Sequence, residues 1–409
     1  MQYDVVIIGA GLAGLSAAEV LSTASELSVA LFEKRHVGSN RTTPMTFVDV
    51  VERFGLQESV QGTYNRFTFD SPLGNKSSHP FDGNPLVALH YRKACEILQE
   101  RALAGGNLSL LKDNVTGIKR GREGGWKLST GSGERIQTPL VIDASGKAML
   151  TSRWLDLPRP TMYSHSFGQL LKNCPVPDPE EVYFLAPSDD YGDGGGWIYP
   201  LDDGLVSFGY ATLGDNVAFP GKLAKARYDA AFREFEPYAN WFKDAEVVHN
   251  EAGSIPICPP NRMVNDGVMR VGDAAGLATI WSCMGSEPAL LSGKLAGEAA
   301  IIAHSQNDFS TKTLNHYQSG WDADYKRIYQ QGKWLAVPSW GQSAESWNSQ
   351  IPRVQDLTSE QMLMRLRTNW PQLPWWQIFL LAGYDLLGRT RRGIVEKLRA
   401  LMKEKDTVE

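Results

Sequence analysis

The first fifteen residues constrain the fold more than any other stretch of this chain. An apolar run over residues 3–8 leads directly into the sequence GAGLAG at residues 9–14, which is followed by an Ala- and Leu-rich segment over residues 15–21. A second apolar run, residues 27–32, ends at Glu33. A buried strand, a glycine-rich turn, a helix and a second strand that ends in an acid are the parts of a dinucleotide-binding βαβ unit.

Each glycine of this turn has a separate physical task. Gly9 permits the tight turn, Gly11 lets the backbone approach a pyrophosphate, and Gly14 lets the helix and the strand pack closely. The helix that begins here adds free N–H groups and the positive end of its dipole. We therefore expect Gly9, Gly11, Ala13 and Gly14 to hold a pyrophosphate, and Glu33 to accept hydrogen bonds from an adenosine ribose.

The position of the fingerprint indicates which dinucleotide is bound. A glycine turn that begins at residue 9 of 409, with an acid after the second strand, favours FAD held by its ADP half. The Glu33 carboxylate disfavours the 2′-phosphate of NADP at this place, although Lys34 beside it offsets part of the repulsion. We predict that FAD is the cofactor and that Lys34 is among the residues that bind it.

Composition and charge exclude other classes of function. The net charge is −5, so no basic surface for nucleic acid is expected. The four cysteines are scattered without C-x-x-C spacing, which predicts no metal site and indicates a reducing compartment. No uninterrupted apolar run reaches about 18 residues, and residue 3 already belongs to the predicted fold, so neither a membrane-spanning helix nor a signal peptide is expected. These features predict a cytoplasmic protein.

Further segments are expected to approach the cofactor. Arg41 lies in a polar loop after the second strand, and Arg92 lies about one turn into a predicted helix over residues 89–98. Either arginine is suited to pair with a phosphate, although a solvent-exposed role is open for both. Val115 begins a predicted strand and is expected to meet the adenine through its backbone. Ala144 follows a buried strand, and small residues in such a turn bring the backbone close to a bound nucleotide.

The last part of the predicted cofactor site follows a short apolar strand over residues 269–271. Gly272 and Asp273 come directly after this strand, and Gly285 and Ser286 precede a predicted helix. An aspartate in this place can accept hydrogen bonds from ribityl hydroxyls. The free N–H groups at the start of the helix can face the anionic pyrimidine edge of a flavin.

The middle of the chain has a different character. Five prolines between residues 158 and 179 interrupt any helix, and short strand-like runs alternate with turns as far as residue 257. We predict an α/β protein, two-lobed in an α+β arrangement. It has a Rossmann-like FAD-binding domain (1–60, 86–155 and 262–305), an antiparallel-sheet substrate domain (61–85 and 156–261) and a helical C-terminal region (306–409).

The C-terminal region is rich in tryptophan and ends in basic residues. Residues 370–381 form the most apolar stretch of the chain, and seven lysines and arginines follow between residues 389 and 405. An apolar aromatic segment next to basic residues is typical of a protein that lies on an anionic membrane surface. Packing against the body of the protein is the alternative, and the sequence leaves both open.

Three separated elements together resemble the flavoproteins of the p-hydroxybenzoate-hydroxylase fold: residues 9–14, 141–146 and 270–293. Within that group the chain is most similar to the geranylgeranyl reductase family, whose members saturate isoprenoid double bonds in archaeal lipids and chlorophyll side chains. The sequence GWIYPLDDGLVSFG at residues 196–209 is similar to the strand pair that lines the lipid pocket of that family. Residues 267–277 are similar to its second flavin motif.

The resemblance implies an FAD-dependent oxidoreductase that reduces carbon–carbon double bonds of an apolar, isoprenoid substrate. The pocket is expected to present one aromatic face from two adjacent strands, made of Trp197, Tyr199, Phe208 and Tyr210. The candidate proton donors are Tyr199, His165 and Cys283, the last on the expectation that a nearby helix N-terminus lowers the thiol pKa.

The electron donor and the reaction type are less constrained. The sequence has no second fingerprint for a nicotinamide, so NAD(P)H or a ferredoxin-type protein is expected to bind transiently. The family's Pro-x-x-x-Cys-Gly pattern near the flavin is replaced by Arg-Thr-Thr-Pro-Met at residues 41–45. Two alternatives share the fold: a monooxygenase that hydroxylates or epoxidises an apolar substrate, and a lycopene-cyclase-like enzyme without net electron transfer. A flavin-bound electron carrier is a non-enzymatic alternative.

Overall fold

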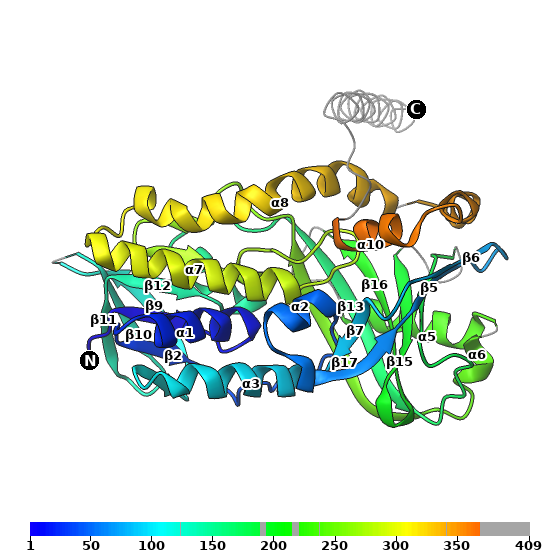
Figure 1. The fold of residues 1–409 in the computed structure, drawn as a ribbon, viewed down its shortest axis with the longest axis horizontal. Helices are drawn as coiled ribbons and strands as arrows, with labels where there is room; N and C mark the ends of the chain where they lie inside the picture. Colours follow the sequence, from blue (N-terminus) through cyan, green and yellow to red (C-terminus); the bar gives the residue numbers. More distant parts are fainter. Residues whose placement is uncertain (123, 189–193, 215–220, 237, 341, 369–409) are drawn as a thin grey trace, which may run out of the picture.

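The computed structural model describes residues 1–122, 124–188, 194–214, 221–236, 238–340 and 342–368. The molecule is elongated, with a largely parallel sheet and its covering helices toward one end and a large, mostly antiparallel sheet toward the other (Figure 1). This two-part α/β architecture confirms the predicted fold class. The predicted domain boundaries stay a prediction.

The first sheet contains the dinucleotide-binding unit. Its strand order is β18-β19-β12-β1-β2-β8, and all neighbours are parallel except β18 and β19. Every residue of the three central strands is buried, as expected for a parallel sheet covered on both faces. The strands are β1 (Val5–Ile8), β2 (Val29–Phe32), β8 (Leu108–Leu111), β12 (Leu140–Asp143), β18 (Val264–Asn265) and β19 (Val268–Arg270).

Long helices pack beside this sheet. Figure 1 shows α7 (Ser286–Gln306) and α8 (Thr311–Trp340) side by side along one edge of the molecule, with α1 (Leu12–Ala24) and α3 (Tyr91–Ala104) beyond them. α1 contacts both α7 and α3. The approach of α7 to α1 depends on Gly293, because a Cβ there would lie 2.1 Å from the carbonyl oxygen of Ala13.

Two small sheets and two short helices complete this part of the chain. One sheet joins β9 (Val115–Arg120), β10 (Trp126–Thr130) and β11 (Arg135–Thr138), and the other joins β3 (Met45–Phe47), β7 (Leu86–Leu89) and β4 (Val60–Tyr64). The short helices are α2 (Val48–Arg53) and α4 (Leu150–Trp154).

The second large sheet has seven strands in the order β17-β13-β16-β15-β14-β5-β6. All neighbours are antiparallel except β14 and β5, which are parallel. β5 comes from an earlier segment of the chain, which reaches the sheet separately from β13–β16. The strands are β5 (Arg66–Asp70), β6 (Lys76–Pro80), β13 (Met162–Lys172), β14 (Glu181–Leu185), β15 (Gly195–Pro200), β16 (Leu205–Gly214) and β17 (Glu246–Ile257).

The two faces of this sheet have different neighbours. One face packs against α5 (Gly221–Glu234) and α6 (Tyr238–Trp241), and we call it the outer face. The opposite face, here the inner face, belongs to the main hydrophobic core. Strand register places six residues in one row across the inner face: Glu251, Gly168, Gly209, Trp197, Phe184 and Phe69.

The C-terminal region is helical over its described part. It contains α8, α9 (Ala344–Gln350) and α10 (Ser359–Thr368). Trp321 of α8 is buried and stacks on Tyr325, while Trp347 of α9 packs against Phe184 of the seven-stranded sheet. These tryptophans therefore pack on the body of the protein. Residues 370–381 and the basic residues after them lie outside the described residues. No helix of the described chain has the length and apolarity to cross a bilayer.

Candidate functional site

The glycine turn lies at the carboxyl ends of β1 and β12, where open parallel sheets bind ligands. Gly9 has a φ of +104°, and a Cβ there would lie 2.4 Å from the carbonyl oxygen of Ala144. A Cβ on Gly14 would lie 1.9 Å from the carbonyl oxygen of Gly9. Any side chain at either position would therefore displace backbone, so the close approach of turn, strand and helix requires glycine. Ala144 lies against this turn, and its contact with the cofactor stays a prediction.

Glu33 lies directly beside the glycine turn. Its Oε2 accepts a hydrogen bond of 3.1 Å from the backbone N–H of Ala10, and its Oε1 accepts one of 2.9 Å from the backbone N–H of Arg35. The carboxylate is thus fixed at the end of β2, where the fingerprint places the acid that binds a ribose. Lys34 is exposed.

Tyr91, the first residue of α3, is a site residue that the sequence analysis missed. A Cβ on Gly11 would lie 3.0 Å from the Tyr91 hydroxyl, so this hydroxyl borders the space above the glycine turn. Burial raises the pKa of Tyr91 well above its ordinary value, which keeps it a neutral donor. Arg92 is exposed, and its backbone and stem pack against Gly38 instead. The register of an N-terminal helical turn is not visible in sequence, which explains the choice of the neighbouring arginine.

Two other predicted cofactor residues lie in different environments. Val115 is buried at the start of β9. Arg41 is exposed in the loop between β2 and β3, and its side chain makes no hydrogen bond with a described residue. The roles assigned to both residues stay predictions.

Gly272 and Asp273 meet the start of α7 close to α1. Gly272 has a φ of +55°, and a Cβ there would lie 3.0 Å from the Cβ of Ala13. Burial raises the pKa of Asp273 to about 6, and its side chain accepts no hydrogen bond from a described residue. Gly285 precedes Ser286, the first residue of α7, and a Cβ on Gly285 would lie 3.8 Å from Oδ1 of Asp273.

These features fit the polar groups of a dinucleotide. The turn leaves room for a ligand at Gly11, the helices α1 and α7 begin with free N–H groups, and Asp273 offers a carboxylate to which no described residue donates. A carboxylate in this position is costly to bury unless a ligand supplies the missing donors. Glu33 at the end of β2 and the Gly272–Asp273 turn before α7 therefore both lie beside the start of α1.

The four aromatic residues predicted to form one pocket face lie on opposite faces of the sheet. Register pairs Ile198 with Phe208 and Trp197 with Gly209, so Trp197 and Tyr199 are on the inner face while Phe208 and Tyr210 are on the outer face. Phe208 stacks on Phe242 at a centroid distance of 4.8 Å. The prediction of one aromatic face was wrong, because side chains directly opposite each other in a strand pair share a face and these four are offset by one residue.

His165 is also on the outer face. It is buried in β13, and its Nδ1 lies 2.8 Å from Oγ of Ser254 on β17. The inner-face residues of β13 are the even-numbered ones from Ser164 to Leu170, so the sheet separates His165 from Tyr199. The structure contradicts His165 as a proton donor at a site on the inner face.

Cys283 lies near the inner face but lacks the expected acidity. Burial raises its thiol pKa to about 11, and the nearby Ser164 hydroxyl of β13 offsets only part of that rise. Its φ is +54°, an uncommon conformation for a residue with a side chain. The expectation of a lowered pKa was wrong, because desolvation of the thiolate outweighs the nearby start of α7. Cys283 is therefore a neutral thiol in this environment.

Tyr199 connects the inner face to the loop before β3. Its hydroxyl donates a hydrogen bond to the backbone carbonyl of Thr43, and Thr43 also contacts Glu251 of β17. Burial raises the pKa of Tyr199 above its usual value, and the nearby Glu251 carboxylate adds to this. The sequence analysis missed Thr43, Glu251 and His249, because their contacts join segments about 200 residues apart and no spacing pattern links them.

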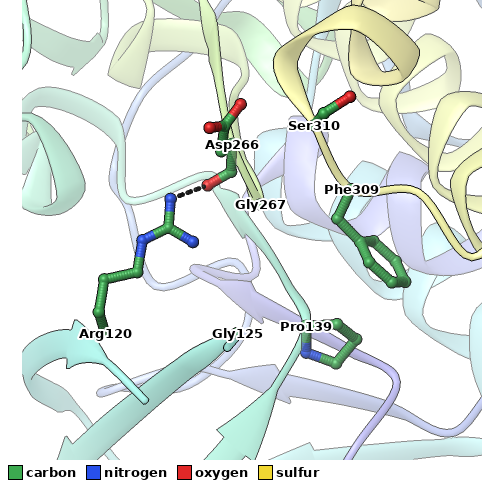
Figure 2. Close-up of a pocket in the computed structure, with 7 residues that line it drawn as sticks. All are labelled: Arg120, Gly125, Pro139, Asp266, Gly267, Phe309 and Ser310. Atoms are coloured by element: carbon green, nitrogen blue, oxygen red, sulfur yellow. Dashed lines mark hydrogen bonds between the residues drawn. The ribbon is translucent and has the colours of Figure 1, made fainter. Parts of the chain in front are cut away.

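A shallow hollow elsewhere is not part of this site. It has a volume of about 270 Å³ and is lined by residues that include Arg120, Pro139, Asp266 and Phe309 (Figure 2). Figure 2 shows the hydrogen bond of 2.9 Å that Arg120 donates to the carbonyl oxygen of Asp266. Pro139 and Asp266 precede β12 and β19, so the hollow lies at the amino ends of the parallel strands, opposite the glycine turn.

Comparison with known proteins places the fold. The chain is 26% identical over 344 residues to digeranylgeranylglycerophospholipid reductase 2 of Methanopyrus kandleri, covering 80% of this chain and 84% of that protein. A geranylgeranyl bacteriochlorophyll reductase-like protein of Thermoplasma acidophilum superposes with a TM-score of 0.76 at 20% identity, covering 87% of this chain and 92% of that chain. A flavin-dependent brominase superposes with a TM-score of 0.73 at 16% identity, covering 96% and 100%.

These similarities confirm the resemblance to the geranylgeranyl reductase family that the sequence motifs predicted, and the structural neighbours confirm the fold. The family described as lycopene cyclase protein matches residues 4–279. Since this match takes in more than half of the 409 residues, the chain belongs to the lycopene cyclase protein family.

Proposed function

We propose that this protein is an FAD-dependent oxidoreductase that reduces carbon–carbon double bonds of an apolar, isoprenoid substrate. The observation that carries the proposal is the segment between Gly276 and Gly285. It joins the carboxylate of Asp273 to the inner face of the seven-stranded sheet, through the bridge of Ala278 to Ile257 and the position of the Cys283 thiol near Ser164 of β13. This segment therefore borders both the proposed cofactor site and the apolar inner face of the sheet.

The residues proposed to hold FAD divide by the part of the cofactor they would contact. Gly9, Gly11, Ala13 and Gly14, with Tyr91, would hold the pyrophosphate, and Glu33 the adenosine ribose. Asp273 would accept hydrogen bonds from the ribityl chain, and the N–H groups at Gly285 and Ser286 would face the pyrimidine edge. Reduced FAD supplies a hydride equivalent for such a reaction, and the protein's tasks are to bind, to orient and to exclude water.

The substrate side of the site is proposed to be the inner face near Trp197. Its middle strands carry small side chains, with Gly168 and Gly209 in one row and Ser166 and Ala211 in the next. Trp281 packs against Phe69 and Phe184 at centroid distances of 5.8 and 5.4 Å and forms an apolar border. An isoprenoid chain needs such a surface, since it offers no polar group along most of its length.

The remaining parts of the proposal concern partners and location. An electron donor, NAD(P)H or a ferredoxin-type protein, is proposed to bind transiently, because the sequence contains one dinucleotide fingerprint. A cytoplasmic location with contact to a membrane surface through the C-terminal region would bring the enzyme to a lipid substrate. The domain boundaries predicted above belong to the same proposal.

An anaerobic half-reaction tests this function. The purified protein is reduced with dithionite, a geranylgeranyl lipid is added, and the flavin absorbance is followed. Reoxidation without oxygen, with a product heavier by two hydrogens per reduced bond, is the expected result. A flavin that stays reduced until air is admitted would instead indicate a monooxygenase. A product of unchanged mass, formed without net oxidation, would indicate a lycopene-cyclase-like reaction.

A further inference from the structure

Thr43 is held against the inner face of the sheet from two sides. Its backbone carbonyl accepts the hydrogen bond from Tyr199 of β15. Its hydroxyl and its backbone N–H donate to the two carboxylate oxygens of Glu251 on β17, at 2.7 and 3.3 Å. Thr43 is 5% exposed. The loop that follows the first βαβ unit is therefore attached to the sheet through a buried, hydroxyl-bearing residue.

His249 extends this group of contacts toward solvent. Its Nε2 lies 3.2 Å from Oε1 of Glu251, the same oxygen that accepts the Thr43 hydroxyl. The His249 and Glu251 side chains are 20% and 11% exposed, so exposure decreases from His249 to Glu251 to Thr43. The other charged pair on this strand, Lys172 with Glu246, is at its exposed beginning.

The three residues border the part of the inner face proposed to receive substrate. Glu251 is in register with Gly168, and the Trp197 indole covers Gly168 and Gly209 in the same row. Ser164, which contacts Cys283, is four residues away along β13, a distance of roughly 13 Å. Thr43 and the Cys283 segment therefore bound this patch from opposite ends.

We propose that His249, Glu251 and Thr43 form a relay that delivers a proton to the substrate. The inference rests on the proposed function. Reduction of a double bond adds a hydride to one carbon and a proton to the other. In the relay, a C–H bond forms as the O–H bond of Thr43 breaks, and Thr43 regains a proton from Glu251. His249 reprotonates Glu251 and takes its own proton from water. All electrons come from the hydride.

The geometry suits this role because each link is a hydrogen bond between groups that exchange protons. A hydroxyl is both donor and acceptor, so Thr43 can release one proton and receive another without moving its oxygen. Glu251 and His249 carry groups that can exchange protons, and they connect the hydroxyl to the more exposed end of this group of contacts. On this proposal Thr43 acts on the substrate, and Glu251 and His249 act through it.

The test uses the dithionite-reduced holoenzyme in anaerobic single turnover with a geranylgeranyl lipid. Thr43→Val keeps the shape and removes the hydroxyl, so reoxidation should slow by about 100-fold or more, the usual size of an acid–base contribution. Thr43→Ser keeps the hydroxyl and should stay within a few-fold of the wild type. Glu251→Gln keeps an acceptor for Thr43 but has no carboxyl group that can transfer a proton, so it should also slow turnover. Glu246→Gln on the same strand is the matched control.

Two measurements that do not depend on turnover accompany the rates. The melting temperature of each cofactor-free variant reports whether the loop attachment is intact. The ¹⁵N shifts of His249 should change in Glu251→Gln, since the ring loses its carboxylate partner. If the relay operates, Glu251→Gln should turn over more slowly than the wild type while its melting temperature stays nearly the same.

Equal single-turnover rates in the wild type, Thr43→Val and Glu251→Gln would overturn the relay while leaving the reductase function intact. A large loss of melting temperature and of flavin content, with a normal rate in the loaded fraction, would assign the group a structural role and overturn the relay as well. A wild-type enzyme that no isoprenoid reoxidises would overturn the proposed function, and the relay with it.

Discussion

The Trp197 indole lies in space that Gly209 leaves open on the neighbouring strand. A Cβ on Gly209 would lie 2.1 Å from Cζ2 of Trp197, closer than any real contact allows. The indole is further fixed by a hydrogen bond of 3.2 Å from its Nε1 to Oγ of Ser207. Trp197 thus covers the backbone of the middle strands, and its position depends on the absence of a side chain opposite it.

We therefore predict that Gly209→Ala destabilises the protein. The added methyl group must displace the indole or the strand, and overpacking of this kind costs about 1–3 kcal/mol. The free energy of unfolding, measured by urea denaturation, should fall by that amount, and the tryptophan fluorescence of the folded state should change. Gly253→Ala is the control, because a Cβ on Gly253 of β17 would meet no described atom within 4 Å. Equal losses in the two variants would contradict the prediction.

The raised pKa of Asp273 predicts a pH-dependent stability of the cofactor-free protein. In the unfolded chain this carboxyl titrates near its ordinary value of 3.8, whereas in the folded protein it titrates near 6. Between these values the folded state keeps a proton that the unfolded state has lost. The stability contribution of Asp273 is therefore highest at low pH, declines as the pH rises from about 4 to about 6, and then levels.

The decline attributable to Asp273 is at most about 3 kcal/mol for a shift of this size. We would measure urea midpoints of the wild type and of Asp273→Asn, which cannot titrate at this position, between pH 4.5 and 7. The stability of the wild type should fall relative to that of the variant as the pH rises. Asp113→Asn is the matched control. Hydrogen bonds with Ser132 lower the pKa of Asp113 to about 2, so it does not titrate in this window. Parallel curves for the wild type and Asp273→Asn would show that the burial of Asp273 costs nothing.

The sequence predicted what depends on local pattern and missed what depends on pairing. The glycine turn, Glu33 and the Gly272–Asp273 segment were found because each task requires a residue type at a fixed spacing. The aromatic residues of β15 and β16 were assigned to one face because their alternation within each strand was visible, whereas the register between the strands was not. A shift of one residue moved Phe208 and Tyr210 to the outer face.

The contacts of Thr43 show the same limit more strongly. Neither its own neighbours in sequence nor those of Glu251 contain a pattern that joins a loop near residue 43 to a strand near residue 251. The two residues meet because the loop before β3 packs on the inner face of the seven-stranded sheet. Side-chain sites of this kind become visible only when the fold is known.

We predict that substitutions of the neighbouring residues Tyr91 and Arg92 affect cofactor binding to different extents. The Tyr91 hydroxyl borders Gly11 of the glycine turn, whereas Arg92 is exposed and packs its stem on Gly38. A hydrogen bond to a charged phosphate contributes about 1.5–3 kcal/mol, so Tyr91→Phe should weaken FAD binding by roughly 10-fold or more. Arg92→Ala should have a smaller effect, through long-range charge only. Titration of each cofactor-free protein with FAD, followed by fluorescence quenching, measures both. A larger loss of affinity in Arg92→Ala than in Tyr91→Phe would assign the phosphate contact to Arg92 instead.

Arg367, near the end of the described chain, connects α10 to α2 and α7 through ion pairs. Its guanidinium forms ion pairs with Asp49 of α2 at 2.6 Å and with Glu287 of α7 at 3.0 Å, and it lies 4.3 Å from the centre of the Phe47 ring. The side chain is 32% exposed, so solvent screens these interactions in part. We predict that Arg367→Ala lowers the free energy of unfolding by about 1–2 kcal/mol, since it also leaves the buried Glu287 with a weaker partner, Arg53 at 3.5 Å. Arg353→Ala is the control, because Arg353 is exposed in the same region. Urea midpoints of the two variants that coincide with that of the wild type would show that α10 is held by its apolar residues alone.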